Sequence, residues 1–251
     1  MPPVVTWLGQ AGFRFEAGGR RILVDPFFSD ADGRRYPPPA ADERGAGIDW
    51  LLVTHEHLDH LDPASLRAVA ERSEGLTIVA PAPLEAMVRD ACADAEFVGV
   101  ARGDRVPLGA AGVATAVPAV HAVHPRDGYA DDPRFVGYVL ELEGVAFYHA
   151  GDTLVTDAVV AALEPLSVDV ALLPINGRTY FREQADLAGN MDVRDAVALA
   201  ARIGASVLVP IHWDLFEGNT EHPGRAADEA AETGAPLHVL TLMRGLPWTA
   251  A

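Results

Sequence analysis

Three histidines and two acidic residues stand within positions 55–60 of this chain. Imidazole and carboxylate groups are common protein ligands of divalent metals. The cluster follows a short apolar run typical of a buried strand. Residues two apart on an extended segment point to the same side, so His55 and His57 can bind one cation together. Asp59 and His60 lie on the bend that follows and can face a second cation. The segment therefore predicts a metal centre rather than a surface loop that happens to be rich in histidine.

Two further candidate ligands stand just past other apolar runs. Asp152 follows the expected strand 145–149 with a glycine directly before it, and a carboxylate placed there can bridge two cations. His212 directly follows the expected strand 206–211. A lone histidine at such a point would usually be an ordinary core or surface side chain. As the last member of an ordered set, it is predicted to be a ligand.

Four other residues have roles that the residues alone leave open. His121 and His124 both follow the expected strand 113–120, and either could be a ligand. His149 is left out of the predicted ligand set, with its role undecided. Asp25 ends the third expected strand, where it either orients a ligand histidine or is an ordinary turn carboxylate.

These candidate ligands need a frame of strands and helices. Apolar runs and turn signals predict strands at 4–8, 13–16, 21–25, 50–53, 76–80, 96–100, 113–120, 135–143, 145–149, 168–173, 206–211 and 236–241. Helical patterns are expected at 64–73, 84–92, 157–163, 193–203 and 225–233. Strands and helices that alternate in two similar halves predict a β-sandwich flanked by helices. The long segment 27–47 is expected to be either a lid or pocket wall, or a plain surface excursion.

Candidate substrate groups follow the expected strand 168–173. They are Asn176, Arg178, Tyr180 and Arg182. Arginine suits a bidentate grip on phosphate or carboxylate, so these residues are expected to hold an anionic or polyhydroxylated substrate at the same rim. Isolated arginines in a loop are also often simply solvated, and both readings stay open.

Composition narrows the function classes. The chain has 251 residues and 49% hydrophobic content, enough for one large core, and no linker divides it, so 1–251 is expected to be a single domain. A formal charge of −17 opposes binding to a nucleic-acid backbone. The single cysteine, Cys92, and the lack of any run long enough to cross a bilayer predict a cytoplasmic protein without a membrane partner. The expected partner is a small-molecule substrate, and a homo-oligomer is compatible with the sequence.

The whole chain resembles the metallo-β-lactamase superfamily, and within it the UlaG-like branch of L-ascorbate-6-phosphate lactonases. The resemblance lies in the segments Thr54–Asp62, Tyr148–Thr153, Leu173–Arg178 and Pro210–Asp214. It implies an α/β (α+β) fold class, with a four-layer αββα sandwich.

The same resemblance implies how the ligands divide between two metals. It assigns His55, His57 and His121 to one metal, Asp59, His60 and His212 to the other, and Asp152 to a position between them. His121 is favoured over His124 because the family places its next ligand directly at the strand end. Zinc is the usual metal of the family, manganese is reported for the lactonase branch, and iron is also compatible with these ligands.

Two divalent ions deprotonate a shared water near neutral pH and polarise a carbonyl oxygen. We therefore expect a hydrolase that uses a metal-bound hydroxide to open a small cyclic ester, such as a lactone or sugar-phosphate lactone, or a related lactam. Asp59 is expected to orient the hydroxide and to return a proton to the leaving oxygen. One alternative is a phosphodiesterase that uses the same two metals. The other is a metal-binding sensor without turnover, which the apparently complete ligand set disfavours.

Overall fold

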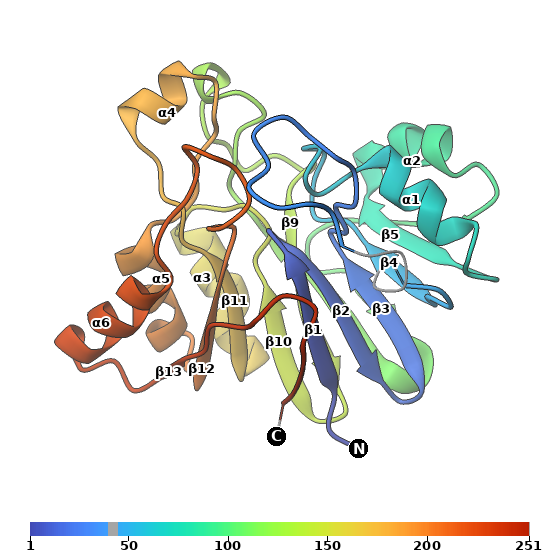
Figure 1. The fold of residues 1–251 in the computed structure, drawn as a ribbon. Coiled ribbons are helices and arrows are strands. Elements are labelled where there is room, and N and C mark those ends of the chain that lie inside the picture. The colour runs from blue at the N-terminus through green and yellow to red at the C-terminus, as the bar shows by residue number, and fades with distance from the viewer. Residues whose placement is uncertain (40–44, 251) are drawn as a thin grey trace.

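Two β-sheets pack face to face in the computed structural model, which describes residues 1–39 and 45–250 (Figure 1). Within the described residues the first sheet has seven strands, in the order β14 (Pro247–Thr249), β1 (Val4–Gly9), β2 (Gly12–Ala17), β3 (Arg20–Val24), β4 (Trp50–Leu52), β5 (Thr77–Pro81) and β6 (Glu96–Val100). The second, described over the same residues, also has seven, in the order β13 (His238–Val239), β12 (Val207–Ile211), β11 (Val170–Pro174), β10 (Val145–His149), β9 (Val136–Leu142), β8 (Gly112–Pro118) and β7 (Arg105–Pro107).

Helices cover the outer face of each sheet. The first sheet is covered by α1 (Pro63–Ala70) and α2 (Glu85–Ala91), and the second by α3 (Asp157–Leu163), α5 (Val193–Arg202) and α6 (Gly224–Thr233). Helix α4 (Tyr180–Gln184) stands apart at the upper edge of the sandwich in Figure 1. Short 3-10 turns span Ala82–Leu84, Gly109–Ala111, Pro125–Asp127 and Glu164–Leu166. This is the expected four-layer αββα sandwich, so that prediction is confirmed.

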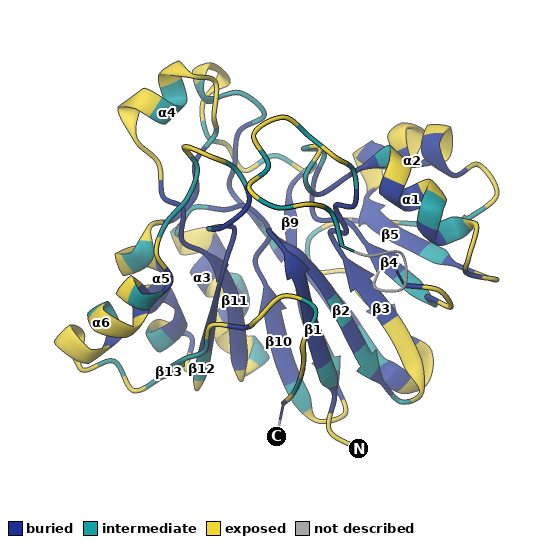
Figure 2. Cartoon of the chain, in the orientation of Figure 1, coloured by how far each residue is buried: buried dark blue, intermediate teal, exposed yellow. Residues whose placement is uncertain are grey.

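The core consists of three apolar layers, one between the sheets and one under each helix layer. Between the sheets, Phe15 of β2 meets Phe147 of β10 edge to face, with ring centroids 5.3 Å apart. Tyr138 is fully buried there and donates a hydrogen bond to the carbonyl of Val53 at 2.9 Å, which ties β9 to the end of β4. Figure 2 shows the strands buried along most of their length. The strand ends are therefore held on a rigid frame.

Helix α1 begins as the sequence predicts. The side chain of Asp62 accepts a hydrogen bond from Ala64 N, and Pro63 occupies the first helical turn. Asp62 also accepts a hydrogen bond from Ser29 N at 3.2 Å, so the helix start anchors part of the long segment 27–47. Residues 40–44 of that segment lie outside the described residues.

Three elements were absent from the expected set, namely β7, β14 and α4, and the expected strand 236–241 is reduced to β13. The missed strands have three residues each, too few to show an alternating pattern. Helix α4 falls where a loop was expected, and Thr179 caps it by accepting a hydrogen bond from Arg182 N. Across the described residues, no helix combines the length and the apolar character needed to cross a bilayer.

Candidate metal centre

Four loops that leave the strands at one edge of the sandwich supply the predicted ligands (Figure 1). His55 follows β4, His121 follows β8, Asp152 follows β10 and His212 directly follows β12. The side chains of these four residues are almost completely buried. Segments far apart in the sequence thus bring metal-binding groups to one place.

The ligands form two groups. In the first, the candidate ligand atoms of His55, His57, His121 and Asp152 all lie within 4.8 Å of one another. In the second, the same limit holds for Asp59, His60 and His212. His55 Nε2 is 3.0 Å from His57 Nδ1, and His212 Nε2 is 3.1 Å from Asp59 Oδ2. The structure therefore brings together all seven predicted ligands, in the same two sets that the resemblance implied.

Asp152 stands between the two groups. Its Oδ1 is 3.3 Å from His60 Nε2 and 3.3 Å from His212 Nε2. Its Oδ2 is 3.5 Å from His121 Nε2. One carboxylate oxygen thus faces each group, as a carboxylate that bridges two cations requires.

Several buried atoms of the centre have no hydrogen-bond partner among the described residues. They include His60 Nε2, His121 Nε2 and Asp152 Oδ1. Buried polar atoms are nearly always satisfied, so unpaired atoms that face one another need an explanation. A divalent cation supplies it, and a donor set of nitrogen and oxygen without thiolate fits zinc, manganese or iron. The residues present therefore fit a metal centre.

Asp25 supports the second group from behind. It is fully buried, and its Oδ2 accepts hydrogen bonds from His60 Nδ1 at 2.7 Å and from Thr54 Oγ1 at 2.6 Å. Its Oδ1 accepts a hydrogen bond from Thr54 N at 2.8 Å. With Nδ1 protonated by this contact, His60 presents the lone pair of Nε2 to the centre. Of the two readings of Asp25, the structure supports the one in which it orients a ligand histidine.

Gly151 lets the chain approach closely before Asp152. Its φ is +58°, and an added Cβ would lie 2.8 Å from Thr54 Oγ1. The Gly151 amide donates to His149 Nδ1 at 3.3 Å, and His149 Nε2 donates to the carbonyl of Ala11 at 2.7 Å. His149 is fully buried, and burial lowers its pKa. It therefore holds the loop that carries Asp152 rather than facing the centre.

The structure separates the two histidines that follow β8. His121 belongs to the first ligand group, whereas His124 is partly exposed and places its Nδ1 2.9 Å from Asp186 Oδ2. His124 lines the pocket beside the centre. The geometry favours His121, as the resemblance did.

Gln10 is a residue of the centre that sequence reasoning missed. Its side-chain Nε2 donates to Asp59 Oδ2 at 2.8 Å and lies 2.9 Å from His212 Nε2, and the residue is 2% exposed. The backbone nitrogen of Gln10 donates to Asp214 Oδ1 at 3.2 Å, and its carbonyl accepts from Trp7 Nε1 at 3.1 Å. A glutamine in the turn 9–12 was the only signal in the sequence.

The pKa values of four histidines shift in opposite directions in the two ligand groups. Burial, followed by the neighbouring histidines, lowers the pKa of His55 well below its usual value, and burial lowers the pKa of His121 to about 3. Burial also opposes the charged forms of His60 and His212, but the nearby carboxylates outweigh it and raise the pKa of both. For Asp152 the histidines outweigh burial and lower the pKa well below its usual value. Because cations take the place of protons at such ligands, metal binding and protonation compete here.

All four predicted substrate residues lie outside the pocket beside the centre. Asn176 is buried and donates from its amide to Asn219 Oδ1 at 3.0 Å. Asn219 itself lines the pocket, so Asn176 contacts a wall residue without reaching the pocket. Tyr180 lies on α4 and is 69% exposed.

Both predicted arginines are turned toward other groups. The guanidinium of Arg182 donates to the backbone carbonyls of Gly218 and Thr220 at 3.0 and 3.1 Å. The guanidinium of Arg178 lies 4.9 Å from the ring centroid of Tyr129. Among the residues that the structure describes, neither arginine belongs to the pocket wall. Their position fits support of the surrounding loops better than a grip on substrate.

A cavity of about 260 Å³ opens over the two ligand groups. His57, Asp59, Asp152 and His212 reach it from the centre. Residues 27–39, the described start of the long segment, do not line it. They support it from outside, because Phe27 packs on the wall residue Phe216 with ring centroids 6.2 Å apart.

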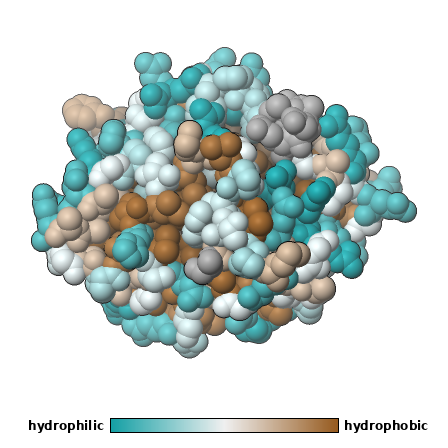
Figure 3. All heavy atoms as spheres, turned by 60° about the horizontal axis from the view of Figure 1, so that its bottom comes forward, coloured by the Kyte–Doolittle hydropathy of each residue, from teal (hydrophilic) through white to brown (hydrophobic). Residues whose placement is uncertain are grey.

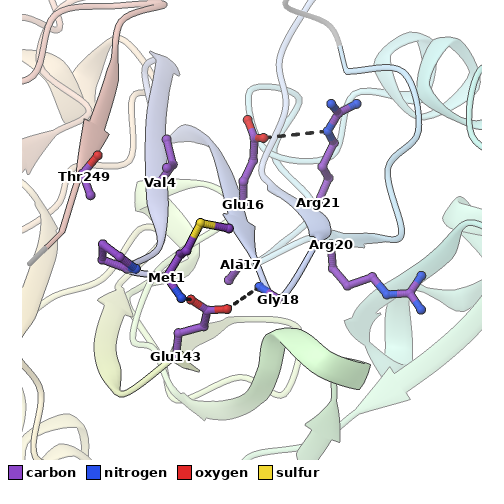
Figure 4. Close-up of a pocket in the computed structure, with 11 residues that line it drawn as sticks. Met1, Val4, Glu16, Ala17, Gly18, Arg20, Arg21, Glu143 and Thr249 are labelled. Atoms are coloured by element: carbon purple, nitrogen blue, oxygen red, sulfur yellow. Dashed lines mark hydrogen bonds and ion pairs between the residues drawn. The ribbon is translucent and has the colours of Figure 1, made fainter.

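A second cavity, of about 530 Å³, lies near the N-terminus (Figure 4). The end of the molecule that carries both chain termini shows hydrophobic residues in the middle of its surface (Figure 3). The charged groups around this cavity are already paired: Glu143 binds the amino group of Met1 at 2.9 Å, Arg21 faces Glu16, and Arg20 pairs with Asp49 at 2.7 Å. This cavity contains no group of metal-binding side chains among its described residues, so the chemistry belongs to the first.

Sequence and fold are both similar to known hydrolases. Residues 20–213 match the sequence profile of the beta-lactamase superfamily domain. The chain is 30% identical over 241 residues to a UPF0173 metal-dependent hydrolase of Alkaliphilus metalliredigens, covering 95% of this chain and 96% of that protein. It is 33% identical over 221 residues to a UPF0173 metal-dependent hydrolase of Thermococcus kodakarensis, covering 87% and 88%. A solved metallo hydrolase from the archaeon Ignicoccus hospitalis has a TM-score of 0.78 at 21% identity, covering 100% of this chain and 99% of that one, a likeness of fold.

Proposed function

We propose that this chain, which belongs to the β-lactamase superfamily and to the family of UPF0173 metal-dependent hydrolases, binds two divalent metal ions and hydrolyses a small cyclic ester. The observation that carries the proposal is the position of Asp152. Its two oxygens face different histidine groups at 3.3 and 3.5 Å, and Oδ1 has no hydrogen-bond partner among the described residues. A shared carboxylate of this kind supports a centre with two metals rather than one.

The ligand assignment follows the two groups. One metal would be held by His55, His57 and His121, the other by Asp59, His60 and His212, with Asp152 shared. When bound, such ions supply a water of lowered pKa and polarise the carbonyl that is attacked. Zinc and manganese are the proposed ions, and iron fits the same donors.

Asp59 is the proposed proton carrier. Its side chain is 18% exposed and lines the cavity, while Gln10 Nε2 donates to its Oδ2 at 2.8 Å. Burial raises the pKa of Asp59, but His60 and His212 outweigh this effect and lower it below its usual value. The carboxylate is therefore ionised at neutral pH and able to accept a proton from the attacking water. It would then return that proton to the leaving oxygen.

The ester part of the proposal rests on the resemblance to the UlaG-like branch in Tyr148–Thr153 and Pro210–Asp214. The volume of the cavity, about 260 Å³, suits a small molecule. The arginines that would face a phosphodiester, Arg178 and Arg182, do not line the cavity. This arrangement favours the ester over the phosphodiester.

The test compares rates on protein loaded separately with zinc and with manganese. The substrates are simple lactones, a sugar-phosphate lactone and bis-p-nitrophenyl phosphate. Asp152→Ala should lose metal and turnover, whereas Asp157→Ala, the same change at an exposed carboxylate, should keep both. Turnover of a lactone that disappears in Asp152→Ala supports the proposal. Turnover of the phosphodiester alone, or none from protein with two bound metals, would favour the phosphodiesterase or the sensor instead.

A further inference from the structure

We propose that the cavity over the metal centre binds the apolar part of an uncharged substrate, so that neutral esters with a hydrocarbon tail are preferred to phosphorylated ones. This inference rests on the proposed function and names its substrate class. It follows from the residues that line the cavity and from the charges they carry.

Most of the surface area that lines the cavity is apolar. The apolar residues of this wall are Leu58, Val123, Leu187, Ala188 and Phe216. Leu58 is 55% exposed and Leu187 is 39% exposed, so both present hydrocarbon to the solvent beside the ligands. Small-molecule sites typically combine such a wall with a few polar groups that fix orientation. Here the polar groups are four of the predicted ligands together with His124, Asp186 and Asn219.

The charges of the wall disfavour an anionic tail. Among the described residues no arginine lines the cavity, whereas Asp186 does. Asp186 is already paired with His124 Nδ1 at 2.9 Å, and Arg126, which does not line the cavity, lies 3.8 Å from the other oxygen of Asp186. A phosphate on the tail would therefore lie beside the carboxylate of Asp186, and no arginine of the described cavity wall could pair with it, so its burial would cost binding energy.

The apolar wall is held in place by contacts outside the cavity. The backbone of Leu187 donates to the carbonyl of Arg182 at 2.9 Å, and the guanidinium of Arg182 binds the carbonyls of Gly218 and Thr220. Arg182 thus joins the loop of Leu187 to the loop that follows Phe216. A side chain expected to hold substrate instead positions the two loops that form the wall.

The experiment uses hydroxamic acids, which bind a metal centre whether or not the protein turns over an ester. Protein loaded with zinc is titrated with acetohydroxamate, with octanohydroxamate and with a hydroxamate whose tail of similar length ends in a phosphonate. A fully buried methylene strengthens binding about fourfold, and because the cavity is open we expect a total gain of at least about tenfold for octanohydroxamate over acetohydroxamate. The phosphonate tail should give no such gain.

Two variants locate the effect. Leu187→Gln should remove most of the gain from the long tail while leaving acetohydroxamate affinity and metal content unchanged. Leu246→Gln, the same change at a leucine that is 54% exposed and outside the cavity wall, should behave like the unchanged protein. Leu187→Lys should shift the preference toward the phosphonate tail.

The outcomes separate this inference from the proposed function. A gain with tail length in a protein that opens no lactone would support the apolar cavity and contradict the cyclic ester. Lactone turnover without such a gain would keep the proposed function and overturn the inference. Equal affinity for all three probes, preference for the phosphonate tail, or no binding of any hydroxamate would also overturn it.

Discussion

Replacing Asp25 by asparagine should weaken one of the two metal sites selectively. Asp25 accepts three hydrogen bonds, from Thr54 N, Thr54 Oγ1 and His60 Nδ1. Asparagine keeps one oxygen, which can still accept from Thr54 N, but its NH₂ group then faces His60. Because two donors cannot share a hydrogen bond, His60 must move its proton from Nδ1 to Nε2. The nitrogen that should bind metal is then blocked.

The size of the effect follows from the contact that is lost. A hydrogen bond to a charged group contributes about 1.5–3 kcal/mol, and each 1.4 kcal/mol is about a factor of ten in affinity. The second site should therefore bind its metal about 10–100 times more weakly, which is also the range typical of changes behind a ligand histidine. Asp25 has φ +45°, a conformation that asparagine tolerates, so the backbone should not add to the cost.

The assay is a metal titration by competition with a chelator, which resolves the two affinities. Asp49→Asn is the matched control, because Asp49 also pairs its carboxylate, with Arg20 at 2.7 Å, but at the surface. We expect one weakened site in Asp25→Asn and none in the control, with circular dichroism unchanged in both. Two unaltered affinities in Asp25→Asn would refute the role assigned to the carboxylate.

Three further changes test the centre. His121→Ala should reduce bound metal from two equivalents to about one, as measured by elemental analysis. His124→Ala should leave both metals in place. The reverse result would make His124 the ligand and His121 the residue outside the centre. Gly151→Ala should destabilise the protein by about 1–3 kcal/mol in a denaturant titration, because the new Cβ would lie 2.8 Å from Thr54 and the φ is +58°. An unchanged unfolding midpoint would contradict this prediction. Asp59→Asn should slow turnover at least about a hundredfold even in protein that retains both metals, and full rate with both metals would exclude its proton role.

The sequence revealed the ligands because their chemistry is local and ordered. Four of the seven lie within six residues, and His121, Asp152 and His212 each follow an apolar run. Strand ends at one edge of a sandwich meet in space, so the order along the chain sufficed to predict a common centre. The helix start at Asp62 was predictable for the same reason, since a cap depends on its immediate neighbours.

Side-chain direction was not predictable in this way. Arg182 and Arg178 have the chemistry to hold an anion, but the sequence does not show that carbonyls of the loop 218–220 lie within reach of one and the ring of Tyr129 within reach of the other. A guanidinium satisfied by backbone carbonyls is no longer available to substrate. The short helix α4, in a segment whose sequence favours a loop, carries Arg182 and directs it there.

The contacts of Gln10 were unpredictable for the same reason, because they depend on side-chain direction. These contacts also keep the centre rigid. Gln10 and His212 both have positive φ, +52° and +57°, although neither is glycine, and such a conformation costs about 1–3 kcal/mol for each residue. Two hydrogen bonds offset this cost. His212 N donates to the carbonyl of Gln10 at 3.2 Å, and the side-chain Nε2 of Gln10 donates to Asp59 Oδ2 at 2.8 Å. The two turns thus fix each other across 202 positions of sequence. Because the two turns meet only in the folded chain, the sequence showed His212 as a ligand by its chemistry but could not show that Gln10 contacts it.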